Sequence, residues 1–302
     1  MRGDLLKKGK IYQSLSGFYD VLCDEKIYRT RARGNFRKKK ITPTVGDDVE
    51  FQTTNENEGY LLNVLPRRNS LVRPPIANID QALLVTSAVE PDFSYNLLDR
   101  QLVSLEINNI KPIIYFTKLD LLDDSKMENF KKIQQSYEKI GYQTILPSLM
   151  DKEKLDSLFH EILKNKETVF MGQTGAGKST LLNQISPGLQ LQTGEISKVL
   201  NRGKHTTRKV SLMKVNGGLV ADTPGFSSYD VLNIDAQYLR NYFPEFKNNA
   251  HECKFRGCVH INEPNCKIKE LLSDGLIEQT RYDNYLNLYN IIKDRKPIYN
   301  KK

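Results

Sequence analysis

The sequence lacks any apolar run that approaches the length of a membrane-spanning helix, although 39% of its 302 residues are hydrophobic. The stretch from Met1 to Lys8 also lacks the apolar core of a signal peptide. The sequence contains no internal repeat and no low-complexity tract. These absences argue against a membrane protein, an exported protein and a repeat array, and they predict a cytoplasmic globular protein with two or three domains.

The sequence has fewer acidic than basic residues. It contains 36 aspartates and glutamates and 45 lysines and arginines, which gives a formal net charge of +9. Such a balance is typical of a protein with a polyanionic partner, although charge alone also fits a merely basic soluble protein. Seven basic residues crowd one stretch: Arg29, Arg31, Arg33, Arg37, Lys38, Lys39 and Lys40. A run of this kind is often a solvated loop. In a small β-domain we interpret it as an RNA-binding surface, because clustered cations gain most from counterion release.

Residues 1–68 are expected to form an all-β domain. Gly, Asp and Asn turn signals separate five short segments that read as strands, at residues 10–15, 18–23, 26–32, 48–53 and 60–64. Five short strands with a basic hairpin predict an OB-type β-barrel, with an SH3-like barrel as the alternative. The residues that follow, from Arg67 to Pro75, indicate a linker.

Residues 69–230 alternate between apolar strands and amphipathic helices. The strands are predicted at residues 81–87, 112–116, 143–146, 168–171, 208–215 and 218–221, and the helices at 97–108, 125–140 and 152–164, with a further helix after 171. This alternation predicts a mainly parallel sheet with helices on both faces and ligands at the carboxyl ends of its strands. Residues 231–302 read as a third, α-helical domain, in which a long helix or helix pair covers 271–293.

A phosphate-binding loop follows the predicted strand at 168–171. The residues expected to contact the nucleotide are Gly172, Gln173, Thr174, Gly175, Ala176, Gly177, Lys178, Ser179 and Thr180. Glycines let backbone N–H groups surround phosphate, and the N-terminus of the next helix adds positive potential. Lys178 is expected to act in catalysis on the β- and γ-phosphates, and Ser179 to ligate Mg²⁺. A chance glycine-rich turn is the alternative, which the strand–loop–helix context disfavours.

A magnesium motif, Asp222-Thr223-Pro224-Gly225, follows the last predicted strand. Asp222 is expected to hold Mg²⁺, and the Gly225 N–H to bond the γ-phosphate and so sense its hydrolysis.

A base-reading motif comprises Thr117, Lys118 and Asp120 at the end of the strand at 112–116. The Asp120 carboxylate can accept both N–H donors on the Watson–Crick edge of guanine, a pair that adenine does not supply, so it predicts GTP rather than ATP. The Lys118 stem can lie over the purine. Thr117 replaces the usual Asn. A helix-capping role is the alternative for Asp120, and residues 147–149 are candidates for a secondary base loop.

The order of these motifs is informative, because an ordinary GTPase carries its base-reading motif last and this chain carries it first. We therefore predict a circularly permuted GTPase. Between the phosphate loop and the magnesium motif, Thr207 is a candidate Mg²⁺ ligand, preferred over Thr206. Phe226 stands where small GTPases place a water-orienting Gln, so intrinsic hydrolysis should be slow unless another group acts. His205 is the nearest polar candidate, although it could be an ordinary surface histidine.

Cysteine is scarce, and three of the four cysteines lie close together. Cys253, Cys258, His260 and Cys266 follow the pattern C-x4-C-x-H-x5-C, which supplies a complete tetrahedral shell for one structural zinc ion. Disulfides are disfavoured in a reducing compartment. Cys23 is expected to be a core residue, and His251 is a competing nitrogen ligand.

Together these residues resemble the RsgA family (also called YjeQ or YloQ) of bacterial small-ribosomal-subunit biogenesis GTPases. The resemblance covers nearly the whole chain and rests on the permuted motif order, on residues 203–207 and on the four zinc-type ligands. It implies an OB domain, a permuted GTPase and a zinc domain. It also implies binding to the 30S subunit late in its assembly, contact with 16S rRNA, hydrolysis of GTP to GDP stimulated by that subunit, and a role for His205. We expect a monomer.

Two other functions are considered. An RNA-binding scaffold with little nucleotide turnover is disfavoured by the intact Lys178, Ser179 and Asp222. An ATP-dependent enzyme such as a kinase is disfavoured by Asp120.

Overall fold

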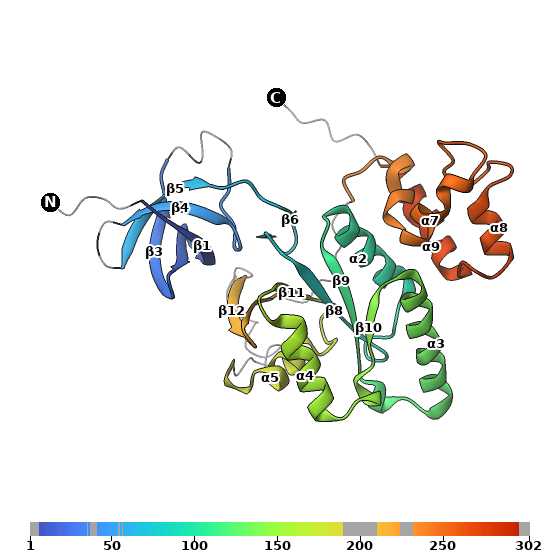
Figure 1. Ribbon diagram of the computed structural model, residues 1–302, viewed down its shortest axis with the longest axis horizontal. Coiled ribbons are helices and arrows are strands. Elements are labelled where there is room, and N and C mark those ends of the chain that lie inside the picture. The colour runs from blue at the N-terminus through green and yellow to red at the C-terminus, as the bar shows by residue number, and fades with distance from the viewer. Residues whose placement is uncertain are drawn as a thin grey trace.

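The computed structural model describes residues 6–34, 36, 41–53, 55, 57–189, 210–223 and 232–295. It comprises a β-barrel, a central α/β domain and a C-terminal helical domain, with the barrel and the helical domain on different sides of the centre (Figure 1). Within these described ranges, no helix combines the length and the apolar character that crossing a membrane requires.

The N-terminal domain is a closed barrel of five strands: β1 (Leu6–Leu15), β2 (Phe18–Cys23), β3 (Lys26–Ala32), β4 (Asp48–Thr53) and β5 (Glu58–Val64). The strand order is β1-β2-β3-β5-β4, β1 also pairs with β4, and β3 runs parallel to β5. Alternate residues face inward, and Ile11, Val21 and Phe51 are fully buried. The predicted OB-type barrel is confirmed, and β1 and β5 begin earlier than expected.

The central sheet contains β8 (Gln81–Ser87), β9 (Lys111–Thr117), β10 (Gln143–Ile145), β11 (Glu167–Met171), β12 (Ser211–Val215) and β13 (Gly218–Asp222). Their order is β10-β9-β8-β11-β13-β12, and every neighbouring pair is parallel except β12 and β13. The predicted mainly parallel sheet is therefore confirmed. All four strands that precede a predicted motif or base loop, β9, β10, β11 and β13, run in the same direction.

Helices cover both faces of this sheet: α2 (Tyr95–Ile107) and α3 (Asp124–Ile140) on one, α4 (Lys152–Leu163) and α5 (Lys178–Ile185) on the other. Successive residues of β8 alternate between the two cores, with Leu84 against the first pair of helices and Leu83 against the second. Helix α3 begins after Asp123, whose side chain accepts a hydrogen bond from the Lys126 N–H, and ends at Gly141 in the left-handed region.

The barrel is fastened to the central sheet. Gln13 of β1 pairs with Ser211 of β12, which makes one sheet of eleven strands. Where a linker was predicted, β6 (Ser70–Leu71) and β7 (Ile76–Ala77) form a short packed hairpin.

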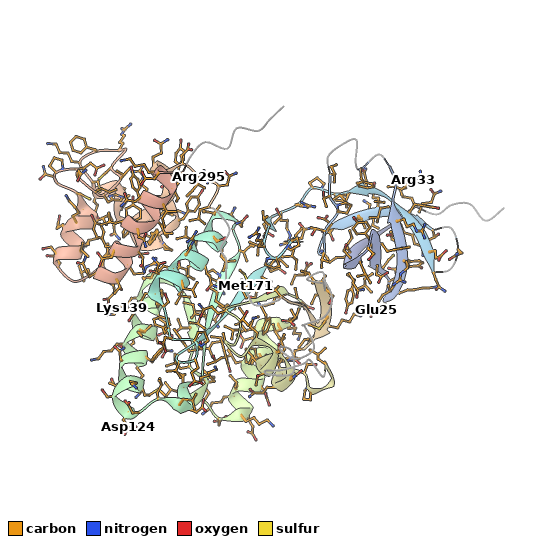
Figure 2. The ribbon with its side chains drawn as sticks, turned by 180° about the vertical axis from the view of Figure 1, so that it is seen from behind. Glu25, Arg33, Asp124, Lys139, Met171 and Arg295 are labelled. Carbon is orange, nitrogen blue, oxygen red and sulfur yellow. The ribbon has the colours of Figure 1, made fainter. Side chains whose placement is uncertain are left out.

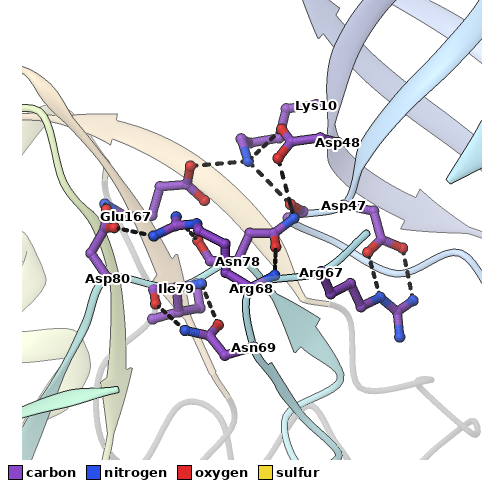
Figure 3. A network of polar contacts seen from close by, with 11 residues as sticks. Lys10, Asp47, Asp48, Arg67, Arg68, Asn69, Asn78, Ile79, Asp80 and Glu167 are labelled. Atoms are coloured by element: carbon purple, nitrogen blue, oxygen red, sulfur yellow. Dashed lines mark hydrogen bonds and ion pairs between the residues drawn. The ribbon is translucent and has the colours of Figure 1, made fainter. Parts of the chain in front are cut away.

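Polar contacts surround this junction (Figure 3). Lys10 lies 2.8 Å from an Asp48 oxygen and 3.0 Å from a Glu167 oxygen, and Arg68 lies 2.8 Å from Asp80. Glu167 begins β11, and Asp80 immediately precedes β8. These ion pairs therefore lie at the amino ends of β8 and β11, whereas the pairing of β1 with β12 lies at Ser211, opposite Asp222 at the carboxyl end of β13.

The C-terminal domain consists of short helices around an aromatic core. They are η4 (Ala236–Tyr242), α7 (Pro244–Asn249), η5 (Ala250–Glu252), α8 (Lys267–Ser273) and α9 (Gln279–Lys293). Phe243, Phe246 and Tyr285 are fully buried, with ring centroids 4.8–5.3 Å apart. The helical character is confirmed, and the segment predicted at 271–293 is a helix pair.

A buried polar network joins this domain to the GTPase-like domain. Arg281 of α9 lies 2.6 Å from Asp99 of α2 and 2.7 Å from Glu245, and Asp99 and Arg281 are almost completely buried. Asp99 also accepts hydrogen bonds from Asn284 at 2.5 Å and from the Tyr137 hydroxyl at 2.7 Å. Both Asp99 oxygens are thus occupied, and the two domains are held together through α2.

Candidate nucleotide and metal sites

The predicted phosphate loop connects β11 to α5 and approaches the neighbouring strand closely. Gly172 has a φ of +150°, and a Cβ on it would lie 2.2 Å from the Val85 carbonyl oxygen. Only glycine fits this position, because a side chain would collide with backbone. Gly177, at φ +90°, is the N-cap of α5, and the half-buried Ser179 is the second residue of that helix.

Lys178 is buried inside this loop. Its Nζ donates hydrogen bonds to the Gly172 and Gln173 carbonyl oxygens at 3.2 and 3.4 Å. Burial lowers its pKa, and the charge of Asp222 opposes that shift. The same burial raises the pKa of Asp222, and Lys178 opposes it. Two buried groups of opposite charge therefore stabilise each other at the end of β11 and β13.

Asp222 has the properties expected of a group that contacts a cation. Its Oδ1 atom is buried and has no hydrogen-bond partner among the described residues. Such an atom is costly to bury unless a partner is supplied. A hard cation such as Mg²⁺ would satisfy it, and the Ser179 hydroxyl is the second oxygen ligand that the motif offers. The residues present therefore fit a nucleotide-bound Mg²⁺.

The base-reading motif follows β9. Thr117 donates a hydrogen bond from its hydroxyl to the Ala176 carbonyl oxygen at 2.7 Å, which connects this motif to the phosphate loop. Lys118 adopts a left-handed conformation (φ 58°), and its ammonium donates to the Glu90 carbonyl oxygen. Asp120 is exposed in the short helix η1 (Leu119–Leu121), while Leu119 is buried below it. Thr117 stands where the motif usually has Asn, and its hydroxyl joins the base-reading motif to the phosphate loop.

A cavity of about 560 Å³ lies between these loops. The residues around it that bear on nucleotide binding are Lys118, Asp120, Pro147, Ser148, Gly177 and Thr180. The base-reading motif, the candidate secondary base loop (η2, Pro147–Leu149) and the start of α5 therefore line one space, which has the size of a small-molecule site.

A Cys3His cluster occupies the helical domain. The ligand atoms of Cys253, Cys258, His260 and Cys266 all lie within 4.8 Å of one another. Burial lowers the pKa of His260 to about 4 and raises that of Cys258 to about 12. A neutral imidazole has a free lone pair, and three cysteine sulfurs, which would bind the metal as thiolates, complete a donor set that suits zinc. The His251 side chain is 74% exposed and lies outside the cluster.

Side chains from α9 hold the loop that carries these ligands. The Tyr282 hydroxyl donates to the His260 carbonyl oxygen and the Tyr285 hydroxyl to the Val259 carbonyl oxygen, each at 2.6 Å. The Glu263 carboxylate accepts hydrogen bonds from the Val259 and Ile261 N–H groups. Sequence reasoning did not identify these supporting residues, since a tyrosine at helical spacing looks like an ordinary core residue.

Several predicted residues lie outside the described ranges: Arg37, Lys38, Lys39, Lys40, His205, Thr206, Thr207 and Gly225. Their predicted roles stay predictions. Arg29, Arg31 and Arg33 are described, and all three are exposed on or just after β3.

The fold and the site together define a P-loop GTPase domain with permuted motif order, flanked by an OB-type barrel and a Cys3His domain. The family model for the RsgA GTPase matches residues 64–232, and that for the RsgA N-terminal domain matches residues 8–61. The chain belongs to the RsgA family of GTPases, which are GTP-hydrolysing enzymes.

Named relatives span the whole chain. The small ribosomal subunit biogenesis GTPase RsgA of Limosilactobacillus reuteri is 56% identical over 98% of this chain and all of that protein. The structure of YloQ, described as a circularly permuted GTPase, is 44% identical, covers 99% of both chains and has a TM-score of 0.79. YjeQ from Thermotoga maritima is 33% identical over 97% of this chain, with a TM-score of 0.81. These relatives agree with the resemblance predicted from the motifs.

Proposed function

We propose that this protein is a biogenesis GTPase of the small ribosomal subunit, which acts in the cytoplasm as a monomer. It binds the 30S subunit late in assembly, contacts 16S rRNA through its barrel and hydrolyses GTP to GDP when docked. The convergence of phosphate loop, base motif and Asp222 at one sheet edge is the observation that carries the nucleotide part. The full-length similarity to proteins named for subunit biogenesis supports the ribosomal part.

The residues divide the work as follows. Asp120 and Lys118 select and cover guanine, Gly172–Thr180 hold the phosphates, and Lys178 offsets charge that develops on them. Ser179, Asp222 and Thr207 hold Mg²⁺, which would supply further charge neutralisation. Gly225 senses the γ-phosphate, and His205 acts in hydrolysis. The Cys3His cluster holds one structural zinc ion.

Turnover of GTP and ATP by the purified protein tests this proposal, measured alone and with 30S subunits, 50S subunits or free rRNA. We expect GTP hydrolysis to rise strongly with 30S subunits only. Turnover that stays low and is raised by no particle would instead favour an RNA-binding scaffold with little nucleotide turnover.

Asp120→Asn is expected to move nucleotide preference from GTP toward xanthosine triphosphate. The carboxamide places a donor against one guanine N–H, whereas the xanthine carbonyl at that position can accept from it. The change should cost about 1–3 kcal/mol in GTP binding, the size of one bidentate base contact. Displacement of a fluorescent guanine nucleotide by GTP, ATP and xanthosine triphosphate measures it. Asp156→Asn, on the exposed surface of α4, is the matched control, and unchanged selectivity in Asp120→Asn would contradict the base assignment.

Removal of zinc is expected to destabilise the C-terminal domain in particular, because the metal would cross-link the loop of Cys253, Cys258 and His260 to Cys266, the residue that precedes α8. Elemental analysis should give one zinc per chain, and a chelator should lower the melting temperature. Cys258→Ser should lose the metal, whereas His251→Ala should keep it. A metal-free chain that melts as the untreated protein does would show that the cluster is not a zinc site.

A further inference from the structure

The outer face of the barrel carries a row of side chains that the nucleotide site does not use. Phe18 on β2 pairs with Arg31 on β3, and Arg31 pairs with Tyr60 on β5. Directly paired residues in neighbouring strands point to the same side of a sheet. The flanking residues of β3, Tyr28 and Thr30, point inward and are buried. Phe18, Arg31 and Tyr60 therefore form a continuous row on the outside, here called the β2–β3–β5 stripe, and Arg33 extends it.

Each arginine of this stripe lies against an aromatic ring. The Arg31 guanidinium is 4.4 Å from the centre of the Phe18 ring, and that of Arg33 is 5.7 Å from the Tyr60 ring. Arg33 also donates to the Gln52 side chain at 2.9 Å. Figure 2 shows Arg33 on the side of the barrel away from the GTPase domain. The two guanidinium groups and the two aromatic rings are thus held in place before any partner binds.

The stripe is accessible and positively charged. Tyr60 is 42% exposed, although tyrosine is ordinarily covered when a core is available. Arg29 is paired with Asp20 at 3.0 Å, but among the described residues Arg31 and Arg33 form no ion pair. Barrel stability gives little reason for an exposed ring beside two arginines that form no ion pair with a described residue. A polyanion that also offers flat apolar surfaces would satisfy both groups.

Resting on the proposed rRNA contact, we propose that the β2–β3–β5 stripe is a stacking platform for unpaired RNA bases. Phe18 and Tyr60 stack on bases, while Arg31 and Arg33 bind the adjoining phosphates. OB barrels use the faces of strands 2 and 3 for oligonucleotides, and the rings lie on strands 2 and 5. A duplex hides its base faces, so this platform selects single strands, loops or bulges over paired RNA.

Fluorescence anisotropy of the full-length protein tests the platform with two labelled probes, a 12-nucleotide oligouridine and a blunt 12-base-pair RNA duplex, over a series of KCl concentrations. Phe18→Leu and Tyr60→Leu should each weaken oligouridine binding about 5-fold or more while keeping the slope of log K against log salt. Arg31→Gln should lower that slope by roughly 0.7, the value for one lost contact on a single strand. Tyr60→Phe keeps the ring and should retain binding. Tyr238→Leu changes a tyrosine of η4 that is 51% exposed, and it is the control for a generic loss of aromatic surface.

The outcomes separate the platform from the proposed function. Equal or tighter binding of the duplex, with no effect of Phe18→Leu and Tyr60→Leu, would overturn the platform and leave 30S-stimulated turnover untouched. If the stripe variants lost 30S binding but still bound both RNA probes, the stripe would contact a ribosomal protein, and the platform would also be overturned. Failure of the wild-type protein to bind either probe at low salt would remove the RNA contact itself. Thermal melting of each variant identifies any that fail to fold. The comparison of oligouridine affinity between Tyr60→Phe and Tyr60→Leu then decides whether the ring is needed for binding.

Discussion

Lys178→Ala is expected to reduce single-turnover GTP hydrolysis on the order of 10²- to 10³-fold, the usual effect of removing one preorganised donor from developing charge. The ammonium is already inside the phosphate loop, held by the Gly172 and Gln173 carbonyl oxygens. Among the described residues, Lys178 is the only buried lysine. Phosphate release measured with excess enzyme, and with saturating 30S subunits, gives the rate.

Lys154→Ala is the matched control, since this lysine is 74% exposed on α4 and, among the described residues, forms an ion pair with Asp151 alone. Its turnover should equal that of the unchanged protein. Nucleotide affinity measured in parallel separates weaker binding from slower chemistry. Wild-type turnover in Lys178→Ala would contradict the assignment of residues 172–180 as the phosphate loop.

Arg281→Met is expected to cost about 3–5 kcal/mol in the free energy of unfolding, because it leaves Asp99 and Glu245 buried without a cation. The interface then contains a carboxylate whose hydrogen bonds from Asn284 and Tyr137 do not neutralise it. Urea unfolding monitored by circular dichroism measures the change in the free energy of unfolding. Tryptophan fluorescence is not an option for this chain, because it contains no tryptophan.

Two comparisons make the prediction specific. Lys126→Met removes an exposed ion pair with Asp123 and should cost less than about 1 kcal/mol. Arg281→Met combined with Asp99→Leu removes both charges of the buried pair, and should cost less than the sum of the single changes. If Arg281→Met matched Lys126→Met, the network would contribute no more than a surface pair.

The motif residues were predictable because their chemistry depends on local order along the chain. A strand followed by Gly172–Thr180, or by Asp222, places polar groups at the carboxyl end of that strand whatever the rest of the fold does. Apolar periodicity located β8 at residues 81–87 and the end of α3 at Gly141, as the structure has them. Local pattern was sufficient for these elements because the alternation of buried and exposed residues is itself local.

Contacts between domains were not predictable in the same way. Asp99 and Arg281 are 182 residues apart, and each looks like a surface charge on an amphipathic helix. The pairing of Gln13 with Ser211 could not be predicted from either strand, because the sequence of an edge strand does not indicate which other strand will pair with it. Thr117 was read only as a departure from Asn, because its bond to Ala176 depends on how two loops fold together.

The pairing of β1 with β12 also affects how binding events communicate. β12 begins shortly after Thr207, and its backbone is bonded to the same strand that closes the barrel against β4. If the barrel binds RNA as proposed, a tilt of the barrel would therefore act on the hydrogen bonds between β1 and β12 at Ser211. Thermodynamic reciprocity then applies: whatever factor GTP adds to the affinity for the subunit, the subunit must add to the affinity for GTP. On the proposed function, hydrolysis would then lower the affinity for the subunit by the ratio of the factors that GTP and GDP contribute, and this ratio would set when the protein leaves the particle.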